Sequence, residues 1–81
     1  MGLYIVLNKI EENNEFSKYE FKLDSEESED FGVVEIRKSD GNVREIKEHP
    51  CDQAGIFFER AAWALLRHWK KREFPQKTCW A

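Results

Sequence analysis

The chain has 81 residues, of which 41 % are hydrophobic and 36 % charged, with a formal net charge of −3 and six Phe, three Trp and two Tyr. This length gives one domain with a single core, and the aromatic content excludes a disordered chain. Two cysteines exclude a disulfide scaffold, and the lack of an apolar run of about 20 residues excludes a membrane-spanning helix, so we predict a soluble cytoplasmic protein with no membrane contact.

The first half of the chain, about residues 2–48, predicts an antiparallel sheet of four strands. Residues 2–10 contain a continuous apolar run, which is typical of a strand covered on both faces, and residues 11–15 (EENNE) predict a turn. Residues 16–23 alternate between apolar and charged side chains, as in a strand with one buried face. Because consecutive strands are usually neighbours, we expect a simple meander.

The segment after the second predicted strand, residues 24–30 (DSEESED), carries five negative charges and no apolar residue. Its composition predicts a solvated loop. A cluster of carboxylates can bind a hard cation, but this segment lacks the glycine and the regular ligand spacing of a calcium loop. We therefore predict no metal site here.

Two further alternating segments, residues 32–38 and 42–48, predict a β-hairpin. A three-residue loop that ends at Gly41 would place Val34 opposite Ile46, whereas a two-residue loop would place it opposite a lysine. Burial of the apolar pair favours the longer loop. In that geometry Gly41 adopts a positive φ as a bulge residue, a conformation that glycine tolerates.

Residues 53–72 predict one long helix, because apolar residues recur along one side of this segment. Asp52 is placed to cap its N-terminus, and Pro75 prevents its continuation. The predicted core stripe consists of Ala54, Phe58, Ala61, Ala62, Leu65 and Trp69, flanked by Phe57 and Leu66.

These elements predict a single α+β domain over residues 1–81 with two layers. One layer is a four-stranded antiparallel sheet (ββββα order), and the other is one long C-terminal helix packed on one face of it. The aromatic tail, residues 73–81, contains Phe74 and Trp80. We expect both aromatic side chains to dock on the domain, since their apolar area favours burial.

The side of the helix that faces away from the predicted core has an unusual composition for a solvated surface. Five residues fall on it: Ile56, Arg60, Trp63, Arg67 and Lys70. Tryptophan and arginine are favoured anchors of protein interfaces, so we predict that Trp63 anchors a partner while Arg60 and Arg67 recognise its charge. In the alternative interpretation, the tail folds back and Phe74 or Trp80 stacks beside Trp63 as an ordinary structural contact.

Candidate residues for chemistry are few and far apart. The imidazole and thiol side chains are His49, Cys51, His68 and Cys79. The first two precede the helix and His68 lies near its other end, about 20 Å away, so they form neither a zinc site nor a Cys–His catalytic pair. We expect Cys51 to be a small buried residue at the corner before the helix, with a reactive thiol as the alternative because a helix N-terminus favours the thiolate. We predict no catalytic residue, no metal and no cofactor.

The charge distribution and the outer helix surface give the functional prediction. Residues 1–50 hold 13 acidic and 7 basic side chains, whereas residues 51–81 hold 3 acidic and 6 basic ones. We predict a non-enzymatic protein-interaction module that acts as a regulatory or inhibitory partner of another protein. The basic aromatic helix half suggests a nucleic-acid-binding domain as the alternative, although the pI near 5.4 and the lack of a binding motif disfavour nucleic acid.

The first predicted strand also bears on self-association. Its apolar residues point to both faces, and one helix covers only one face of a sheet. In a meander this strand lies at an edge, where an uncharged apolar strand can pair with a second copy. We predict either a homodimer or a monomer in which the tail supplies the missing cover.

Overall fold

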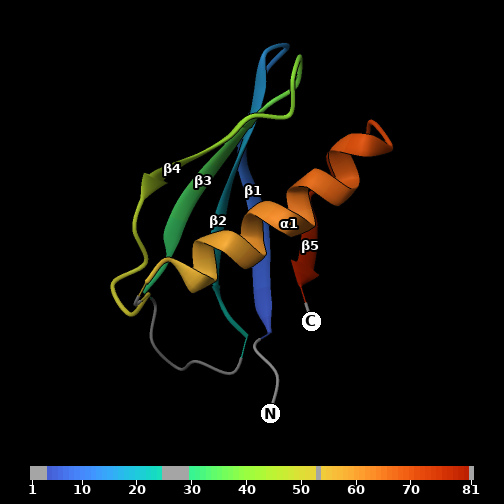
Figure 1. The fold of residues 1–81 in the computed structure, drawn as a ribbon. Coiled ribbons are helices and arrows are strands. Elements are labelled where there is room, and N and C mark those ends of the chain that lie inside the picture. Colours follow the sequence, from blue (N-terminus) through green and yellow to red (C-terminus); the bar gives the residue numbers. More distant parts are fainter. Residues whose placement is uncertain (1–3, 25–29, 53, 81) are drawn as a thin grey trace.

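The computed structural model of the chain describes residues 4–24, 30–52 and 54–80. They form a five-stranded antiparallel sheet with one helix packed on one face (Figure 1). The elements are β1 (Ile5–Glu12), β2 (Phe16–Leu23), β3 (Gly32–Arg37), β4 (Val43–Lys47), α1 (Ile56–Lys70) and β5 (Lys77–Trp80). The strand order is β4-β3-β2-β1-β5, and each neighbouring pair is antiparallel. The predicted α+β architecture is confirmed, with five strands in place of four.

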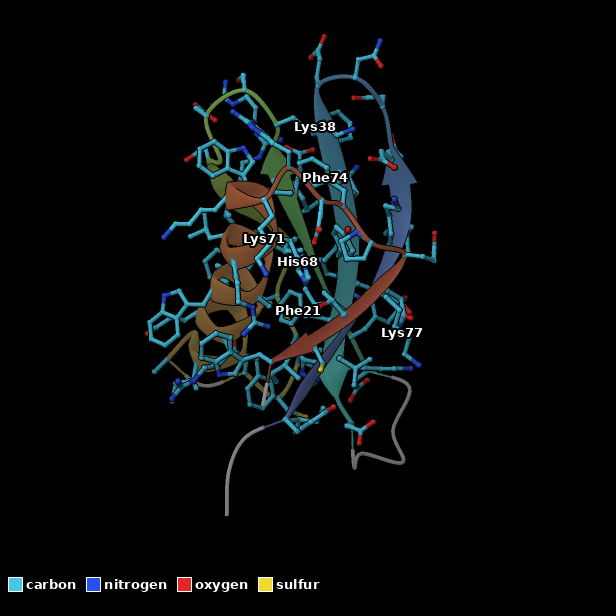
Figure 2. The ribbon with its side chains drawn as sticks, turned by 90° about the vertical axis from the view of Figure 1, so that its right-hand side faces the viewer. Phe21, Lys38, His68, Lys71, Phe74 and Lys77 are labelled. Atoms are coloured by element: carbon cyan, nitrogen blue, oxygen red, sulfur yellow. The ribbon has the colours of Figure 1, made fainter. Side chains whose placement is uncertain are left out.

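The additional strand, β5, comes from the tail that the sequence predicts only to dock. It pairs with β1, from Lys77 opposite Asn8 to Trp80 opposite Ile5 (Figure 1, Figure 2). A four-residue strand is too short to show a period in the sequence, and Pro75 just before it indicates a break. β1 is thus an interior strand with a neighbouring strand along each edge. The predicted free edge of β1, on which the homodimer prediction depends, does not exist.

The core lies between α1 and the sheet. Its fully buried hydrophobic side chains are Ile5, Leu7, Tyr19, Phe21, Val34, Ile36, Ala61, Ala64 and Leu65. Tyr19 and Phe21 confirm the alternation predicted for β2. The helix stripe is rotated from the prediction, because Ala64 is buried whereas Ala54 is exposed and precedes the helix. β5 widens the sheet beyond β1, so the side of α1 that carries Ala64 and His68 is covered as well.

Helix α1 begins three residues later than predicted. The two carboxylate oxygens of Asp52 accept the backbone N–H groups of Phe57 and Phe58, at 2.9 and 3.1 Å. Asp52 therefore accepts hydrogen bonds from the first turn as predicted, but the N-cap residue is Gly55, three positions downstream. The intervening Ala54 and Gly55 take left-handed conformations, with φ of 63° and 70°, which turn the chain before the helix starts.

Three predictions fall partly outside the described residues. The start of the first predicted strand at residues 2–3, most of the acidic segment at 25–29 and the predicted first helical residue, 53, lie there. Within the described ranges, β1 extends to Glu12, so the turn after it is shorter than predicted. Those same ranges contain no helix that is both long enough and apolar enough to cross a membrane.

The β3–β4 hairpin differs from the predicted register. Val34 lies opposite Glu45 instead of Ile46. The N–H of Arg37 donates to the carbonyl of Asn42 at 2.8 Å, which leaves a loop of four residues. A β-bulge then excludes Ile46 from pairing, and its side chain is 44 % exposed. The predicted register was wrong because it assumed that the side chain of Ile46 is buried opposite Val34. An edge strand can instead leave such a side chain exposed.

The loop of this hairpin is held by the C-terminal end of α1. Gly41 has a φ of 73°, as predicted, and a Cβ at this position would lie 2.8 Å from the Trp69 ring. The indole Nε1 of Trp69 and the guanidinium of Arg72 both donate to the carbonyl of Lys38, at 2.8 and 2.9 Å. The helix ends at Lys70, two residues earlier than predicted, and Arg72 follows with a left-handed φ of 57°. Contact with the helix end thus shapes the loop as much as its own sequence does.

Candidate functional site

The face of α1 turned away from the sheet carries the residues that the sequence predicts for partner binding. They are Ile56, Arg60, Trp63, Arg67 and Lys70. Ile56 and Trp63 are 46 % and 42 % exposed, although both are large and apolar. A tryptophan with this exposure on the middle of a helix is a surface residue, not part of the core.

Trp80, the last residue of β5, packs against Trp63. The two ring centroids lie 5.4 Å apart and the ring planes meet at 61°, an edge-to-face arrangement. This is the contact that the alternative interpretation predicts for Trp80, whereas Phe74 packs elsewhere, 4.9 Å from the Lys38 ammonium group. Because Trp63 stays exposed in this arrangement, the docked strand enlarges the aromatic surface instead of covering it.

Two arginines lie on these tryptophan rings. The guanidinium carbon of Arg60 lies 5.2 Å from the ring centroid of Trp63, and that of Arg67 lies 5.4 Å from the ring centroid of Trp80. Arg67 Nη2 also donates to the Cys79 carbonyl at 3.2 Å. We call the side chains of Arg60, Trp63, Arg67 and Trp80 the tryptophan–arginine cluster.

A shallow hollow of about 420 Å³ adjoins the cluster on the outer side of α1. Its walls are Trp63, Leu66, Arg67, Trp69, Lys70 and Trp80. Three of the five predicted residues, Trp63, Arg67 and Lys70, meet at this hollow. Arg60 contacts the Trp63 ring, and Ile56 lies beyond the walls. The hollow and the ring contacts thus involve four of the predicted residues, and Ile56 takes part in neither.

Three wall residues could not be assigned to the site from the sequence. Helical periodicity places Leu66 and Trp69 beside the core, and the position of Trp80 depends on where the tail docks. In the structure all three are half-buried, because one part of each side chain packs inward while another part faces the hollow. For Trp80, the only indication in the sequence was the presence of two aromatic residues in the tail. For Leu66 and Trp69 there was no indication in the sequence.

The cations on this face differ from those on the sheet in the groups that surround them. In the part of the chain that the structure describes, Arg60, Arg67 and Lys70 form no ion pair. A cation on the sheet behaves differently, since Arg44 pairs with Glu35 at 3.0 Å. The outer face of α1 thus combines aromatic surface with cations that form no ion pair with any described carboxylate.

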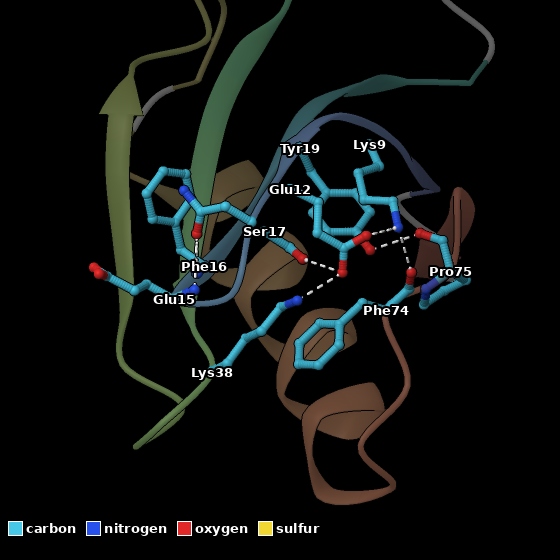
Figure 3. Close-up of polar contacts among 10 residues, drawn as sticks. Lys9, Glu12, Glu15, Phe16, Ser17, Tyr19, Lys38, Phe74 and Pro75 are labelled. Atoms are coloured by element: carbon cyan, nitrogen blue, oxygen red, sulfur yellow. Dashed lines mark hydrogen bonds and ion pairs between the residues drawn. The ribbon is translucent and has the colours of Figure 1, made fainter.

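A second group of charged side chains lies at the other end of the sheet, near the β1–β2 turn (Figure 3). The carboxylate of Glu12 accepts hydrogen bonds from Lys9 and Lys38, at 2.6 and 2.8 Å. The hydrogen bonds from Lys38 and Lys9 lower the pKa of Glu12 to about 2. The Ser17 hydroxyl donates to the same carboxylate at 3.2 Å. We call Lys9, Glu12 and Lys38 the Glu12 ion cluster.

The segment that joins α1 to β5 is fixed at this place. Lys9 Nζ donates to the Phe74 carbonyl at 2.7 Å, and the Tyr19 hydroxyl donates to the Pro75 carbonyl at 2.6 Å (Figure 3). Burial, and to a smaller extent the charge of Glu12, raise the pKa of Tyr19 to about 12, so this hydroxyl remains a neutral donor. These polar groups find their partners inside the protein, which indicates a structural role.

The imidazole and thiol side chains do not converge on one site. The Nδ1 atom of buried His49 accepts the N–H of Cys51 at 3.0 Å, while His68 shares a hydrogen bond of 2.7 Å with Thr78. The described residues contain no group of three or more His, Cys, Asp or Glu side chains that could hold a metal ion. Cys51 is exposed and lies upstream of the first turn of α1, so the interpretation of Cys51 as a small buried residue is wrong.

Comparison with known proteins adds no assignment to this geometry. The chain matches no protein-family model, no curated protein and no solved structure. The surface chemistry of α1 and β5 is therefore the basis on which a function can be proposed.

Proposed function

We propose that this protein is a non-enzymatic protein-interaction module that binds an acidic segment of another protein through the tryptophan–arginine cluster. One observation carries the proposal: half-exposed Trp63 is stacked with Arg60 on a face whose cations have no carboxylate partner among the described residues. Tryptophan and arginine side chains contribute much of the binding energy once an interface buries them. Both residue types lie on this face of the free protein. A protein that binds another protein without catalysing a reaction is suited to a regulatory or inhibitory role.

The chemistry of this face selects the kind of partner. An arginine on the face of a ring keeps its N–H donors available at the edge of its plane, where a carboxylate can accept two of them. An apolar side chain next to that carboxylate would cover Trp63. A second copy that presented the same face would instead bring Arg60, Arg67 and Lys70 against their own equivalents. An acidic partner is therefore favoured over self-association through this face.

The cysteines are consistent with a cytoplasmic location, which forms part of the proposal. Cys51 and Cys79 do not form a disulfide. Thiols persist in a reducing compartment, whereas secreted small domains usually rely on disulfides. We therefore place the interaction in the cytoplasm.

Nucleic-acid binding is a second candidate that the same face supports. A tryptophan beside an arginine is a platform on which an unpaired base can stack. The net charge of −3 and the acidic Glu59 within α1 argue against it, because phosphate binding depends on local positive charge. A titration with mixed single-stranded oligonucleotides at low salt tests this candidate. Binding that weakens steeply with added salt would favour it over the protein partner.

The protein-binding proposal is tested by selecting peptides on the intact protein from a random dodecapeptide display library. We expect the selected peptides to be rich in aspartate and glutamate and to contain an aromatic or aliphatic residue. Trp63→Ala should weaken their binding by about tenfold or more, as for an interface anchor, and Arg60→Ala should weaken it less.

Arg44→Ala is the matched control for Arg60→Ala, because it removes an exposed arginine from β4 on the sheet. This variant should bind the selected peptides as the wild type does. The thermal unfolding midpoint of each variant shows that it is folded at the temperature of the binding measurement. Equal affinity of the wild-type and Trp63→Ala proteins for the peptides would contradict the proposal.

A further inference from the structure

β5 is the outer strand of the sheet beside β1, and the direction of its backbone groups can be determined. The Gln76 carbonyl, just before β5, accepts a backbone hydrogen bond of 2.8 Å from β1. Residues of an antiparallel ladder alternate between those bonded to the neighbouring strand and those directed away from it. Thr78 and Trp80 therefore turn their N–H and C=O groups toward β1, and Lys77 and Cys79 turn theirs toward the open edge.

The contact of Arg67 with β5 agrees with this direction. Its guanidinium donates to the Cys79 carbonyl at 3.2 Å, from outside the sheet. Figure 2, which views the molecule from the β5 side, shows this strand in front of β1 and β2, with α1 to one side and Lys77 near its start. The edge thus offers the backbone groups of two alternate residues, at the spacing that an added strand requires.

The opposite edge of the sheet, β4, is protected against such pairing. Its bulge displaces Ile46, and Glu45 is paired with Val34, whose side chain faces the helix layer. Burial raises the pKa of Glu45, so this carboxyl is already partly desolvated. Bulges and inward-pointing charges are devices that block the addition of a further strand. β5 pairs with β1 without any register shift, and Trp80 and Thr78 are its inward residues.

We infer that the acidic segment binds as an extended strand added to the free edge of β5, an inference that rests on the proposed function. The backbone of the segment bonds to the outward N–H and C=O groups of Lys77 and Cys79. A carboxylate of the segment takes the place of the Cys79 carbonyl as the acceptor of Arg67. An apolar side chain of the segment packs on Trp80 and widens the contact with the tryptophan–arginine cluster.

Charge selects an acidic strand over a second copy of β5. Lys77 stands at the start of the strand, and Arg67 lies across its edge. Antiparallel pairing of two β5 strands would place both helices on the same face of the joined sheet, which brings the two Arg67 side chains to the same side. An acidic segment instead meets both cations with opposite charge.

Strand pairing dictates an alternating sequence in the bound segment. Side chains of opposite residues lie on the same face of the sheet. The residue opposite Trp80 lies toward α1 and is expected to be apolar, whereas the residue opposite Lys77 lies on the open face and is expected to be acidic. The bound peptide therefore has a period of two, in contrast to the 3.6-residue period of a helical segment.

Lys77→Pro and Lys77→Ala separate the backbone contact from the charge. Lys77 is the first residue of β5 and its N–H points outward, a position at which a sheet tolerates proline. Both substitutions remove the ammonium group, but only proline removes the N–H. We expect the selected dodecapeptides to bind Lys77→Pro about tenfold more weakly than Lys77→Ala.

N-methylation of one selected dodecapeptide tests the inference without any change in the protein. Each backbone N–H of the peptide is methylated in turn, and the dissociation constant is measured. Methylation at alternate positions should weaken binding by about tenfold, while methylation between them should have little effect. A scan without a period of two, or equal affinity of the two Lys77 variants, would overturn strand addition. If Lys77→Pro does not fold, the N-methylation scan alone tests whether the peptide adds as a strand.

These measurements also separate the inference from the proposed function. If Trp63→Ala loses affinity while Lys77→Pro and Lys77→Ala bind equally, the protein binds peptides on α1 without strand pairing, and the inference fails alone. If Trp63→Ala binds as the wild type does, the proposed function fails and the inference fails with it. If the wild-type protein selects no peptide, both are overturned.

Discussion

Two groups of cations in this small domain are used in opposite ways. In the Glu12 ion cluster, Lys9 and Lys38 share one carboxylate, whose pKa they hold at about 2. In the tryptophan–arginine cluster, Arg60 and Arg67 lie on indole rings. The first arrangement satisfies its charges within the protein, whereas the second leaves guanidinium donors for another molecule. The group beside a cation, more than the number of cations, therefore distinguishes a structural contact from the proposed binding surface.

The largest expected effect contrasts two tryptophans of α1: Trp69, which packs on the hairpin loop, and Trp63, which lies on the outer face. Trp69→Ala should lower the free energy of unfolding by about 3 kcal/mol, because it removes the ring over Gly41 and the hydrogen bond to Lys38. Trp63→Ala should lower it by about 1 kcal/mol or less, since much of its ring is already in water. Urea unfolding followed by far-UV circular dichroism measures both. Equal losses would place Trp63 among the structural residues and break the comparison.

A smaller effect is expected at two glycines with similar positive φ angles. Gly41 and Gly55 have φ of 73° and 70°, but a Cβ at Gly41 would meet the Trp69 ring at 2.8 Å, while nothing lies within 4 Å of a Cβ at Gly55. Gly55→Ala should cost about 1 kcal/mol of unfolding free energy through the left-handed conformation alone. Gly41→Ala should cost about 2 kcal/mol because of the additional clash. If the two variants are equally stable in urea, Trp69 does not hold the hairpin loop.

The Glu12 ion cluster predicts a dependence of stability on pH. The pKa of Glu12 is about 2 in the folded protein, below its ordinary value of 4.5, so the charged carboxylate stabilises the fold above about pH 4.5. This contribution is lost as the pH falls toward 2, where the carboxyl becomes protonated in both states. Because Glu12 is partly exposed, we expect Glu12→Gln to cost about 1 kcal/mol at pH 7. Urea unfolding of both proteins at pH 7 and pH 2.5 should show this difference shrinking; a constant difference would refute the assignment.

The smallest expected effect is that of Arg60→Ala on stability. Arg60 contacts the Trp63 ring at the surface and forms no ion pair in the described part of the chain. Its removal should change the free energy of unfolding by less than about 0.5 kcal/mol, as for most exposed cations. Thermal and urea unfolding measure this, with Arg44→Ala as the matched substitution on the sheet. A loss above about 1 kcal/mol would assign Arg60 to the structural group.

Local signals predicted those parts of the fold in which a residue depends mainly on its chain neighbours. Strict alternation placed β2 at Phe16–Leu23, as the structure has it. The glycine of the hairpin loop, Gly41, has the expected positive φ. Asp52 accepts hydrogen bonds from the first turn of the helix. Each of these features follows from steric and hydrogen-bonding preferences over a few residues, so no tertiary contact is needed to predict it.

Features that depend on distant contacts were not predictable in the same way. The four residues of β5 become a strand only by pairing with β1, and the register of β4 depends on a bulge that leaves Ile46 exposed. The candidate site likewise contains some residues placed by local sequence and others placed by distant contacts. Periodicity placed Arg60 and Trp63 on the outer face, but the position of Trp80 could be given only as an alternative because it depends on β5. The pairing of β5 with β1 brings Trp80 into the tryptophan–arginine cluster, and the composition of the tail does not predict this pairing.

The pairing of β1 with β5 has a consequence for the order in which the protein forms. It brings together residues as far apart in the chain as Tyr4 and Cys79, 75 positions from each other. Contacts of such sequence separation form slowly, because the intervening chain loses entropy before the contact stabilises it. During synthesis β1 leaves the ribosome first, but it gains its second neighbour only after residues 77–80 have emerged. Trp80 then meets Trp63 in the same step, so the tryptophan–arginine cluster is complete only after β5 has paired with β1.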